Sequence, residues 1–363
     1  MSYSPTAIVT SPYGRMSVSS DDAPHTNLSV THGVQGYHKV TSDEAKTILE
    51  IVFYFYFSGA ISVMGTVANV INMTVFIKQG FSDSVNISLL GLAVADLGSL
   101  VTLIWMSVCF SPWFRHSDIP FDAKDIQYLT AGWPHVCFAR ITSWITAFIS
   151  LERCVCIALP LKVKQIITPR RTLYLVTSIF VVMFACVTPV FCVIGIGEKY
   201  FEDRNVTVLG LVYTPNGPDI ENVVFSITVF SQLSAFILVI ICTIILVHNL
   251  ILKSKWRQSA TKEVEGGSKS AVSARDKKVV VMVTLISSIF IACFLPSAIN
   301  LICMIRYSPD YSVVGREQNT FLGSWAIMNT LEATNSTVNI VVYYHMSSKF
   351  RVVLLGLFRR DGG

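Results

Sequence analysis

Long apolar stretches alternate with short polar segments along the chain. A helix needs about 20 apolar residues to cross roughly 30 Å of hydrocarbon, and seven stretches reach this length. They are approximately Leu49–Ile77, Ile87–Phe110, Ile126–Leu159, Leu173–Ile196, Val223–Leu252, Val279–Ile305 and Phe321–His345. The segments between them contain the Pro, Gly, Asp and Asn residues that are typical of loops. The pattern predicts an all-α membrane protein, a bundle of seven transmembrane helices.

The composition excludes a soluble globular protein. Of the 363 residues, 52% are apolar and 14% are charged, whereas about 25% of the residues in a typical soluble domain are charged. So few charged side chains cannot cover the surface of a water-soluble globule. Nine cysteines are too few for a disulfide scaffold, and no Cys-x-x-Cys pair suggests a metal or redox site.

Basic residues are concentrated on one side of the predicted bundle. Residues 1–50 and the segments after the second, fourth and sixth spans carry a net charge of −6, and the other loops and the tail carry +12. Because cytoplasmic loops are enriched in Lys and Arg, we expect the N-terminus outside the cell. The predicted parts are an extracellular tail (1–47), the bundle (48–346), and an amphipathic helix with a short cytoplasmic tail (347–363). Asn27 and Asn205 lie in Asn-x-Ser/Thr sequons on the outer side and are predicted glycosylation sites.

The third apolar stretch contains Pro134, which cannot donate a helical hydrogen bond. Either the helix starts near Lys124 and bends at the proline, or it starts at Pro134 and runs for about 26 residues. We favour the bent helix because Ile126–Leu129 is largely apolar and Asp122 can cap its start.

Several polar residues lie inside the predicted spans, where a charge costs several kcal/mol unless it has a partner, a cavity or a function. One face of the seventh span carries Glu332, Asn335, Ser336, Asn339 and Tyr343. Asn69 lies on the first span, Asp96 is a lone carboxylate on the second, and Glu152-Arg153 closes the third. A single Ser or Asn can simply hold helices together, but clusters at helical spacing indicate a function.

The order and spacing of these residues resemble those of rhodopsin-like (class A) G-protein-coupled receptors over nearly all of residues 48–358. Asn69 and Asp96 match polar anchors of the first two helices in that family. Three motifs of its third, sixth and seventh helices are matched by Glu152-Arg153-Cys154, Cys293-Phe294-Leu295-Pro296 and Asn339-Ile340-Val341-Val342-Tyr343. Four further stretches resemble mollusc chemosensory-type receptors: residues 125–135, 141–146, 156–164 and 331–336.

The resemblance implies a receptor that binds an extracellular chemical ligand, a chemosensory cue, and activates a heterotrimeric G protein. The alternative within the class is a receptor for an FMRFamide-like neuropeptide. The implied activation-switch and G-protein-coupling residues are Glu152, Arg153, Pro160, Leu161, Asp276, Pro296 and Tyr343. We expect Arg153, a permanent cation, to pair with Glu152 and Asp276 at rest. The alternative, that Asp276 is an ordinary solvated charge, stays open.

A buried sodium site is also implied by the resemblance. The five matching positions are Asp96, Thr142, Asn335, Ser336 and Asn339. A lone carboxylate with four neutral oxygen-bearing side chains suits a hard monovalent cation. A proton on Asp96 is the alternative, because burial of an unpaired carboxylate favours its neutral form.

By the geometry of the family, the ligand pocket opens outward among the third, fifth, sixth and seventh helices. The candidate ligand-binding residues are His135, Arg140, Gln232, Asn300, Asn329 and Glu332, above Phe294. Arg140 and Glu332 either pair with each other or receive opposite charges on a ligand such as an amino acid or small peptide. His135 stands where amine receptors carry Asp, and Ala333 stands where opsins carry the retinal-binding Lys, which disfavours both classes.

The chain departs from the family pattern on its extracellular side. Tyr128 stands at the third-helix position of the usual disulfide cysteine, and the predicted loop Gly197–Ile220 has no Cys. Cys109, Cys192 and Cys303 lie near outer helix ends and offer a substitute bridge, whose pairing the sequence does not determine.

Two other classes of membrane protein fit the sequence less well. A channel or transporter needs a pore-lining polar stripe or paired broken helices, and a membrane enzyme needs a metal or nucleophile constellation. The seven histidines are scattered and include no His-x-x-x-His pair.

From the resemblance we expect a multi-pass protein of the plasma membrane that contacts membrane lipid and no nucleic acid, with arrestin and a receptor kinase as further partners.

Overall fold

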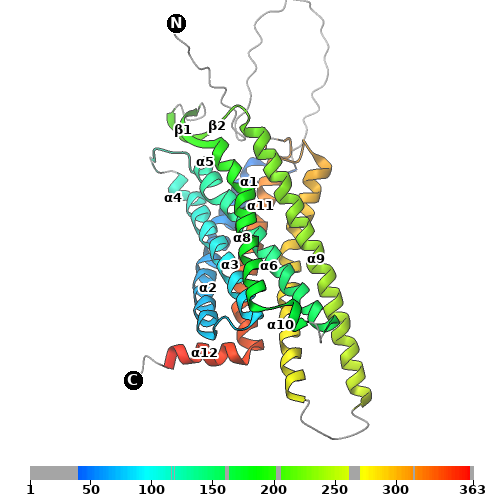
Figure 1. Cartoon of the computed structure of the whole chain (residues 1–363). Coiled ribbons are helices and arrows are strands. Elements are labelled where there is room, and N and C mark those ends of the chain that lie inside the picture. The colour runs from blue at the N-terminus through cyan, green and yellow to red at the C-terminus, as the bar shows by residue number, and fades with distance from the viewer. Residues whose placement is uncertain are drawn as a thin grey trace, which may run out of the picture.

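Continuous runs of helix, called rods below and numbered in chain order, lie side by side and form an elongated bundle (Figure 1). One rod can contain several helical elements that follow one another without a break. The computed structural model describes residues 40–115, 117, 119–159, 163–201, 206–260, 270–313 and 315–359. The elements are α1 (Asp43–Leu49), η1 (Glu50–Ser58), α2 (Gly59–Gln79), α3 (Ser84–Phe110), α4 (Pro112–Arg115), α5 (Ala123–Gln127), η2 (Tyr128–Gly132), α6 (Trp133–Ala158), α7 (Val163–Ile166), α8 (Pro169–Val193), β1 (Ile194–Phe201), β2 (Val206–Tyr213), α9 (Gly217–Ala260), α10 (Ser270–Tyr307), α11 (Gln318–Met346) and α12 (Ser348–Arg359). The predicted site residues Asn27, Asn205, Pro160 and Leu161 lie outside the described residues, as does the side chain of Asp276 in α10.

Six of the described rods are both long and apolar enough to cross a membrane. They are Asp43–Gln79, Ser84–Phe110, Ala123–Ala158, Pro169–Val193, Gly217–Leu252 and Lys278–Tyr307. The seventh rod, α11, has 29 residues and therefore spans about 43 Å. Its buried face carries a carboxylate, amides and hydroxyls, which lower its hydropathy. The predicted all-α bundle is confirmed.

The third rod is irregular where the sequence predicts a bend. Residues Tyr128–Gly132 form a π-helix directly before Pro134, which lies in the first turn of α6. A proline has no N–H to donate and its ring crowds the carbonyl four residues earlier, and the wider π turn relieves both constraints. Asp122 caps the rod, because its Oδ1 accepts the backbone N–H groups of Lys124 and Asp125, each at 3.0 Å. The prediction that this helix starts near Lys124, and not at Pro134, is therefore confirmed.

The segment between α8 and α9 is a β-hairpin, where the sequence led us to expect a helix end and a loop. β1 pairs antiparallel with β2, with Ile194 opposite Tyr213 and Phe201 opposite Val206. The predicted end of the fourth span at Ile196 is wrong because α8 ends at Val193 and the apolar residues that follow belong to β1. Leu211 on β2 is fully buried and joins the hydrophobic core.

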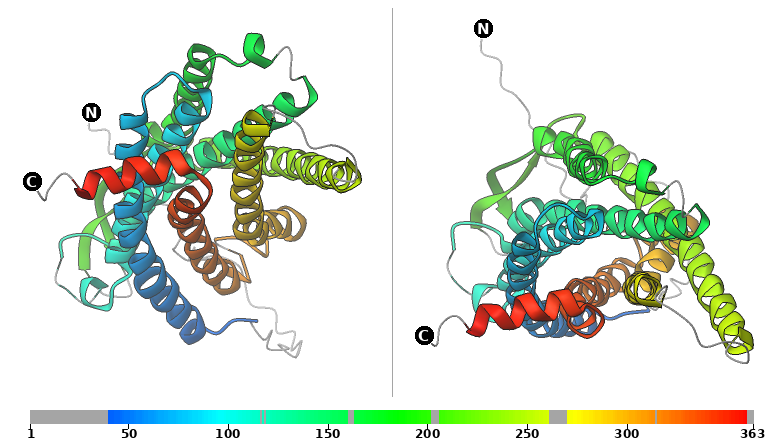
Figure 2. Two further views of the ribbon diagram at one scale, coloured as in Figure 1. Left: turned by 90° about the horizontal axis from the view of Figure 1, so that it is seen from below. Right: turned by 60° about the horizontal axis from the view of Figure 1, so that its bottom comes forward.

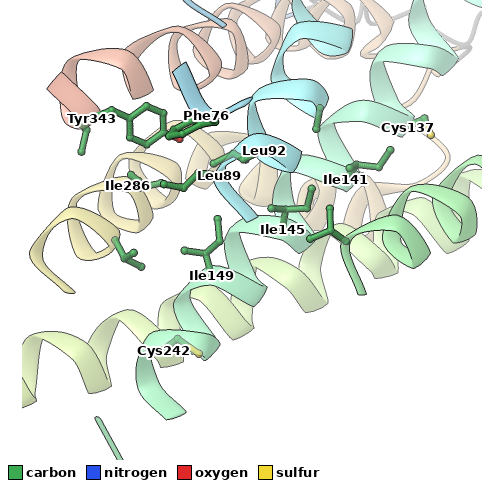
Figure 3. Close-up of a cluster of buried hydrophobic side chains, with 14 of the residues drawn as sticks. Phe76, Leu89, Leu92, Cys137, Ile141, Ile145, Ile149, Cys242, Ile286 and Tyr343 are labelled. Atoms are coloured by element: carbon green, nitrogen blue, oxygen red, sulfur yellow. The ribbon is translucent and has the colours of Figure 1, made fainter. Parts of the chain in front are cut away.

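Apolar side chains, most of them aliphatic, fill the interior along α6 from Cys137 to Ile149 (Figure 3). Leu92 of α3, Ile145 and Ile149 of α6 and Ile286 of α10 belong to one buried cluster. By contrast, α8 buries Thr172, Val176, Val187 and Val190 only. Many of its large apolar side chains, among them Val181, Phe184 and Phe191, are exposed, as expected for a helix that faces lipid.

The last helix, α12, lies across the end of the bundle opposite the hairpin (Figures 1 and 2). Phe350 anchors it, because its ring is buried against the rings of Phe76 and Tyr343, with centroids 5.6 Å away in both cases. Val352 and Leu355 are exposed on α12, next to Lys349 and Arg351 in the sequence. This combination suits a helix on a membrane surface.

All nine cysteines lie in the described part of the chain as free thiols. The substitute bridge considered for Cys109, Cys192 and Cys303 does not form. The end of the bundle that carries the hairpin is therefore held by noncovalent contacts.

Candidate functional site

A buried carboxylate joins three helices in the middle of the bundle. Asp96 on α3 has no exposed surface. Its Oδ1 accepts hydrogen bonds from the hydroxyls of Thr142 on α6 and Ser336 on α11, each at 3.0 Å, and its Oδ2 accepts one from Asn339 Nδ2 at 2.9 Å. Four of the five residues predicted for a sodium site therefore meet. The fifth, Asn335, is buried on α11, but it is not among the described donors to Asp96.

Asn69 links the same site to the first rod. Its Nδ2 donates to the backbone oxygens of Gly65, at 3.0 Å, and Ser336, at 2.8 Å. Asn72 donates in turn to Asn69 Oδ1 at 3.3 Å. Ser336 therefore binds the first rod through its backbone and α3 through its side chain, which fixes α11 against both.

The groups around Asp96 fit a small hard cation. Asp96 supplies the negative charge, and hard cations prefer carboxylate and neutral oxygen ligands. The hydroxyl groups of Thr142 and Ser336 can rotate so that their lone pairs face a cation. Asn339 Oδ1 is buried without a hydrogen-bond partner among the described residues, so a further oxygen is available.

The C-terminal end of α6 carries an ion pair. Arg153 Nη2 lies 2.8 Å from Glu152 Oε1, and Ser84 Oγ at the start of α3 donates to the same oxygen at 2.5 Å. The predicted contact between Glu152 and Arg153 is present. Glu152 Oε2 and Arg153 Nε are buried and form no hydrogen bond within the described part of the chain, so both groups retain capacity for another partner.

Two further predicted switch residues, Pro296 and Tyr343, lie on α10 and α11. Pro296 lies inside α10, where it removes one backbone hydrogen bond and creates a point at which the helix can bend. Phe294 stacks on Phe290 with ring centroids 4.4 Å apart. Tyr343 is buried against Phe76, and no described group hydrogen-bonds to its hydroxyl.

A second buried pair lies nearer the end of the bundle that carries the hairpin. His135 on α6 and Glu332 on α11 are both buried, with Nε2 and Oε2 3.2 Å apart. The other ring nitrogen, Nδ1, lies 3.2 Å from Ser99 Oγ on α3. Three helices therefore meet at His135, as they do at Asp96.

Arg140 binds α9 and not Glu332. Its Nη1 donates to Gln232 Oε1 at 2.6 Å, and Ser143 Oγ lies 2.9 Å from the same oxygen. The direct pairing of Arg140 with Glu332, one of the two predicted alternatives, does not form. Arg140 Nε and Gln232 Nε2 are buried without a described partner, so each can still donate a hydrogen bond.

Two predicted ligand-binding residues lie apart from this network. Asn300 Oδ1 accepts hydrogen bonds from Tyr311 and Ser324 between α10 and α11. Asn329 donates to Tyr54 of η1 at 3.2 Å. The structure therefore gathers His135, Arg140, Gln232 and Glu332 on α6, α9 and α11, and assigns the two asparagines to helix contacts at the edge.

The hydroxyl partners of these groups were not predicted from the sequence. They are Ser84, Ser99, Ser143, Tyr54 and Tyr311. Serine occurs in every predicted span and tyrosine in several of them, so the residue type alone carries no signal. Only their position relative to a charged or amide side chain on another helix marks them.

Comparison with known proteins gives one family and several distant relatives. Residues 68–343 match the family model of the 7 transmembrane receptor (rhodopsin family). The chain is 25% identical to neuropeptide receptor 22 of Caenorhabditis elegans, with 78% of this chain and 63% of that protein aligned. It is 25% identical to the allatostatin-A receptor of Bombyx mori (85% and 79%) and 22% identical to the human growth hormone secretagogue receptor type 1 (82% and 78%). The chain thus spans a little under two thirds of the first of these relatives.

Proposed function

Because the chain belongs to the rhodopsin family of seven-transmembrane receptors, we propose that it binds an extracellular ligand and then activates a heterotrimeric G protein. Membership makes it a multi-pass membrane receptor and not an enzyme. One observation carries the proposal: α6 holds His135 and Arg140 in a charged network near one end and Arg153 at the other. The same helix therefore joins a candidate ligand site to a candidate G-protein site.

Signal transfer uses the ion pair at the inner end of α6. In the resting state Glu152 holds Arg153 at 2.8 Å. A bound ligand favours a second conformation, in which α10 moves away from α6 and Arg153 turns toward the G protein. Pro296 provides the bend in α10. Asp276, as a second acid for Arg153, and Leu161, as an apolar contact to the G protein, stay predictions.

The ligand we propose is a peptide with charged ends or charged side chains. Arg140 offers a buried cation whose Nε is unused, and Glu332 offers a buried carboxylate held by His135. A ligand carboxylate can replace Gln232 at Arg140, and a ligand ammonium group can replace His135 at Glu332. The relatives named for neuropeptides and for allatostatin-A support a peptide. The finer resemblance to mollusc chemosensory-type receptors, and with it a chemosensory ligand, stays a prediction.

We also propose that Asp96 binds a sodium ion that modulates the receptor. The support is the fit described above, a fully buried carboxylate surrounded by oxygen-bearing side chains from two other helices. The alternative is a proton on Asp96. The two differ in the response to NaCl at fixed pH, which only bound sodium produces.

The proposed location is the plasma membrane, with the N-terminus outside and α12 on the cytoplasmic side. The charge distribution of the sequence supports this orientation. Antibodies to an N-terminal tag should label intact cells, and antibodies to a C-terminal tag should label only permeabilised cells. Glycosylation at Asn27 and Asn205 is expected in the same orientation.

Guanine-nucleotide exchange on co-expressed G proteins tests the proposed activity. The receptor is tested against representatives of each G-protein class, without ligand and with a library of synthetic invertebrate neuropeptides. We expect exchange that is lost in Arg153→Ala and kept in Arg351→Ala, which removes an arginine from α12. Exchange that survives Arg153→Ala, or no exchange with any G protein and peptide, contradicts the proposal.

A further inference from the structure

The hairpin is attached to the third rod by one buried carboxylate. Asp125 in α5 is only 1% exposed. Its Oδ2 lies 2.7 Å from Nζ of Lys199 on β1 and accepts the backbone N–H of Leu211 on β2 at 3.1 Å. Both strands of the hairpin are therefore bound to the same atom of a single side chain.

Backbone hydrogen bonds add a second attachment two residues earlier on β2. Leu209 donates its N–H to the carbonyl of Pro120 at 2.9 Å and accepts the N–H of Asp122 at 2.8 Å. β2 therefore continues its pairing onto the chain just before α5. Gly210 lies between Leu209 and Leu211, and a Cβ at this position would lie 2.9 Å from Asp125 Oδ2 and from Lys199 Cδ. A side chain at residue 210 would therefore displace the Asp125 carboxylate or the Lys199 side chain from the contact that they form.

A second carboxylate joins the third rod to the start of α9. Tyr128, the residue at the position of the family's disulfide cysteine, donates its hydroxyl to Glu221 Oε1 at 2.5 Å. The third rod and the start of α9 are therefore joined through the Glu221 carboxylate.

We propose that Asp125 and Glu221 form a polar staple, which holds the extracellular hairpin and the outer end of α9 to the third rod in place of a disulfide. A buried charge requires its partners, so loss of one partner leaves an uncompensated group and opens the contact. The rods that the staple joins carry Arg140 and Gln232, which meet at 2.6 Å. Asp125 and Glu221 are therefore positioning residues for the candidate ligand site. This role rests on the proposed function, but the existence of the staple does not depend on that function.

Hydrogen–deuterium exchange of the full-length receptor in lipid nanodiscs tests the staple without a ligand or G protein. Residues 206–213 report on the hairpin, and the Leu211 amide reports directly on Asp125. In Asp125→Asn and in Gly210→Ala we expect these amides to exchange at least tenfold faster, because the hairpin opens more often once its contact with Asp125 is lost. A tenfold increase corresponds to a fall of about 1.4 kcal/mol in the free energy of opening. In Tyr128→Phe we expect faster exchange at the start of α9, over residues 217–225.

Gly195→Ala is the matched control for Gly210→Ala. It makes the same substitution on the same hairpin, but a Cβ at residue 195 has no heavy atom within 4 Å. We expect wild-type exchange in this variant, and no change in the wild-type protein on addition of a thiol reductant. Unchanged hairpin exchange in Asp125→Asn, or equal effects of Gly210→Ala and Gly195→Ala, overturns the staple. Because amide exchange does not require signalling, the two proposals can fail separately. If amide exchange supports the staple but the receptor causes no nucleotide exchange, only the proposed function is refuted.

Discussion

Replacement of Asp96 by Asn separates a sodium site from a purely structural cluster. The carbonyl oxygen of the new amide can accept both hydroxyl bonds that Asp96 Oδ1 now accepts from Thr142 and Ser336. The NH2 group of the new asparagine side chain would face the NH2 group of Asn339. A flip of the Asn339 amide removes this conflict, because it turns Asn339 Oδ1, which has no described hydrogen-bond partner, toward the new donor. Three hydrogen bonds persist, so we expect the free energy of unfolding to fall by about 1 kcal/mol or less.

Asp96→Ala should be more costly, because it leaves an amide donor and two hydroxyls without an acceptor. An unsatisfied buried donor costs about 1–3 kcal/mol, and the hydroxyls can turn back to carbonyls of their own helices. We therefore expect a loss of roughly 2–4 kcal/mol. The difference between the free energies of unfolding of Asp96→Asn and Asp96→Ala measures what the hydrogen bonds contribute to stability, apart from the charge.

Sodium adds a third measurable quantity. An ion at ten times its Kd stabilises the folded receptor by about 1.4 kcal/mol. Thermal unfolding of the purified receptor in nanodiscs, in NaCl and in choline chloride of equal ionic strength, gives the sodium-dependent shift of Tm. We expect this shift in the wild-type protein and its loss in Asp96→Asn, even though that variant remains folded.

Glu332→Gln is the control for the sodium measurement. It replaces another buried carboxylate of the same bundle by an amide, and the described partners of Glu332 do not include the Asp96 site. The NaCl shift should persist in this variant. A wild-type Tm that changes with pH but not with NaCl supports a proton on Asp96 and refutes the sodium site, as does an NaCl shift that survives Asp96→Asn.

Three further outcomes follow from the contacts described above. Glu152→Gln should raise ligand-independent nucleotide exchange several-fold, because it removes the charge that holds Arg153; equal exchange to wild type would contradict this. His135→Ala should lower the free energy of unfolding by about 1–3 kcal/mol, because it leaves the buried Glu332 carboxyl without its hydrogen-bond partner, and adding Glu332→Gln should restore part of the loss in Tm. Phe350→Ala should cost about 3–5 kcal/mol at the α12 contact and speed amide exchange in α12, whereas Val352→Ala, at an exposed position, should not.

The long elements were predictable because length and hydropathy determine them. Each span needs about 20 apolar residues, and the predicted starts and ends differ from the helices mainly in polar end turns. The cap at Asp122 followed from its side-chain chemistry. The hairpin was missed because Ile194 and Ile196 extend the hydrophobicity of α8 without a break. The π-helix Glu50–Ser58 was missed because its residues continue the apolar stretch of the first span and carry no separate signal.

The site was only partly predictable, because the partners of its polar side chains lie on other helices. The Asp96 partners lie at helical spacing on one face of α11, and the resemblance located Thr142, so these groups were found together. The choice of partner for Arg140 depends on how far α9 stands from α6, which no pattern within one helix encodes. The same holds for the contact of Tyr128 with Glu221, which needs the positions of two rods and a hairpin.

Ligand and sodium should oppose each other, because both act on the contact between α6 and α11. His135 and Thr142 are seven residues apart on α6, about 10 Å, and their partners Glu332 and Ser336 are one turn apart on α11. A ligand that takes Glu332 from His135 frees α11 to shift against α6, whereas an ion at Asp96 needs oxygens from both helices together. By linkage, each must lower the affinity of the other by the same factor. The concentration of an activating peptide that gives half-maximal nucleotide exchange should therefore rise with NaCl in the wild-type receptor and stay constant in Asp96→Asn. An equal rise in both proteins would show that salt weakens the peptide contact itself and that α6 and α11 do not couple the two sites.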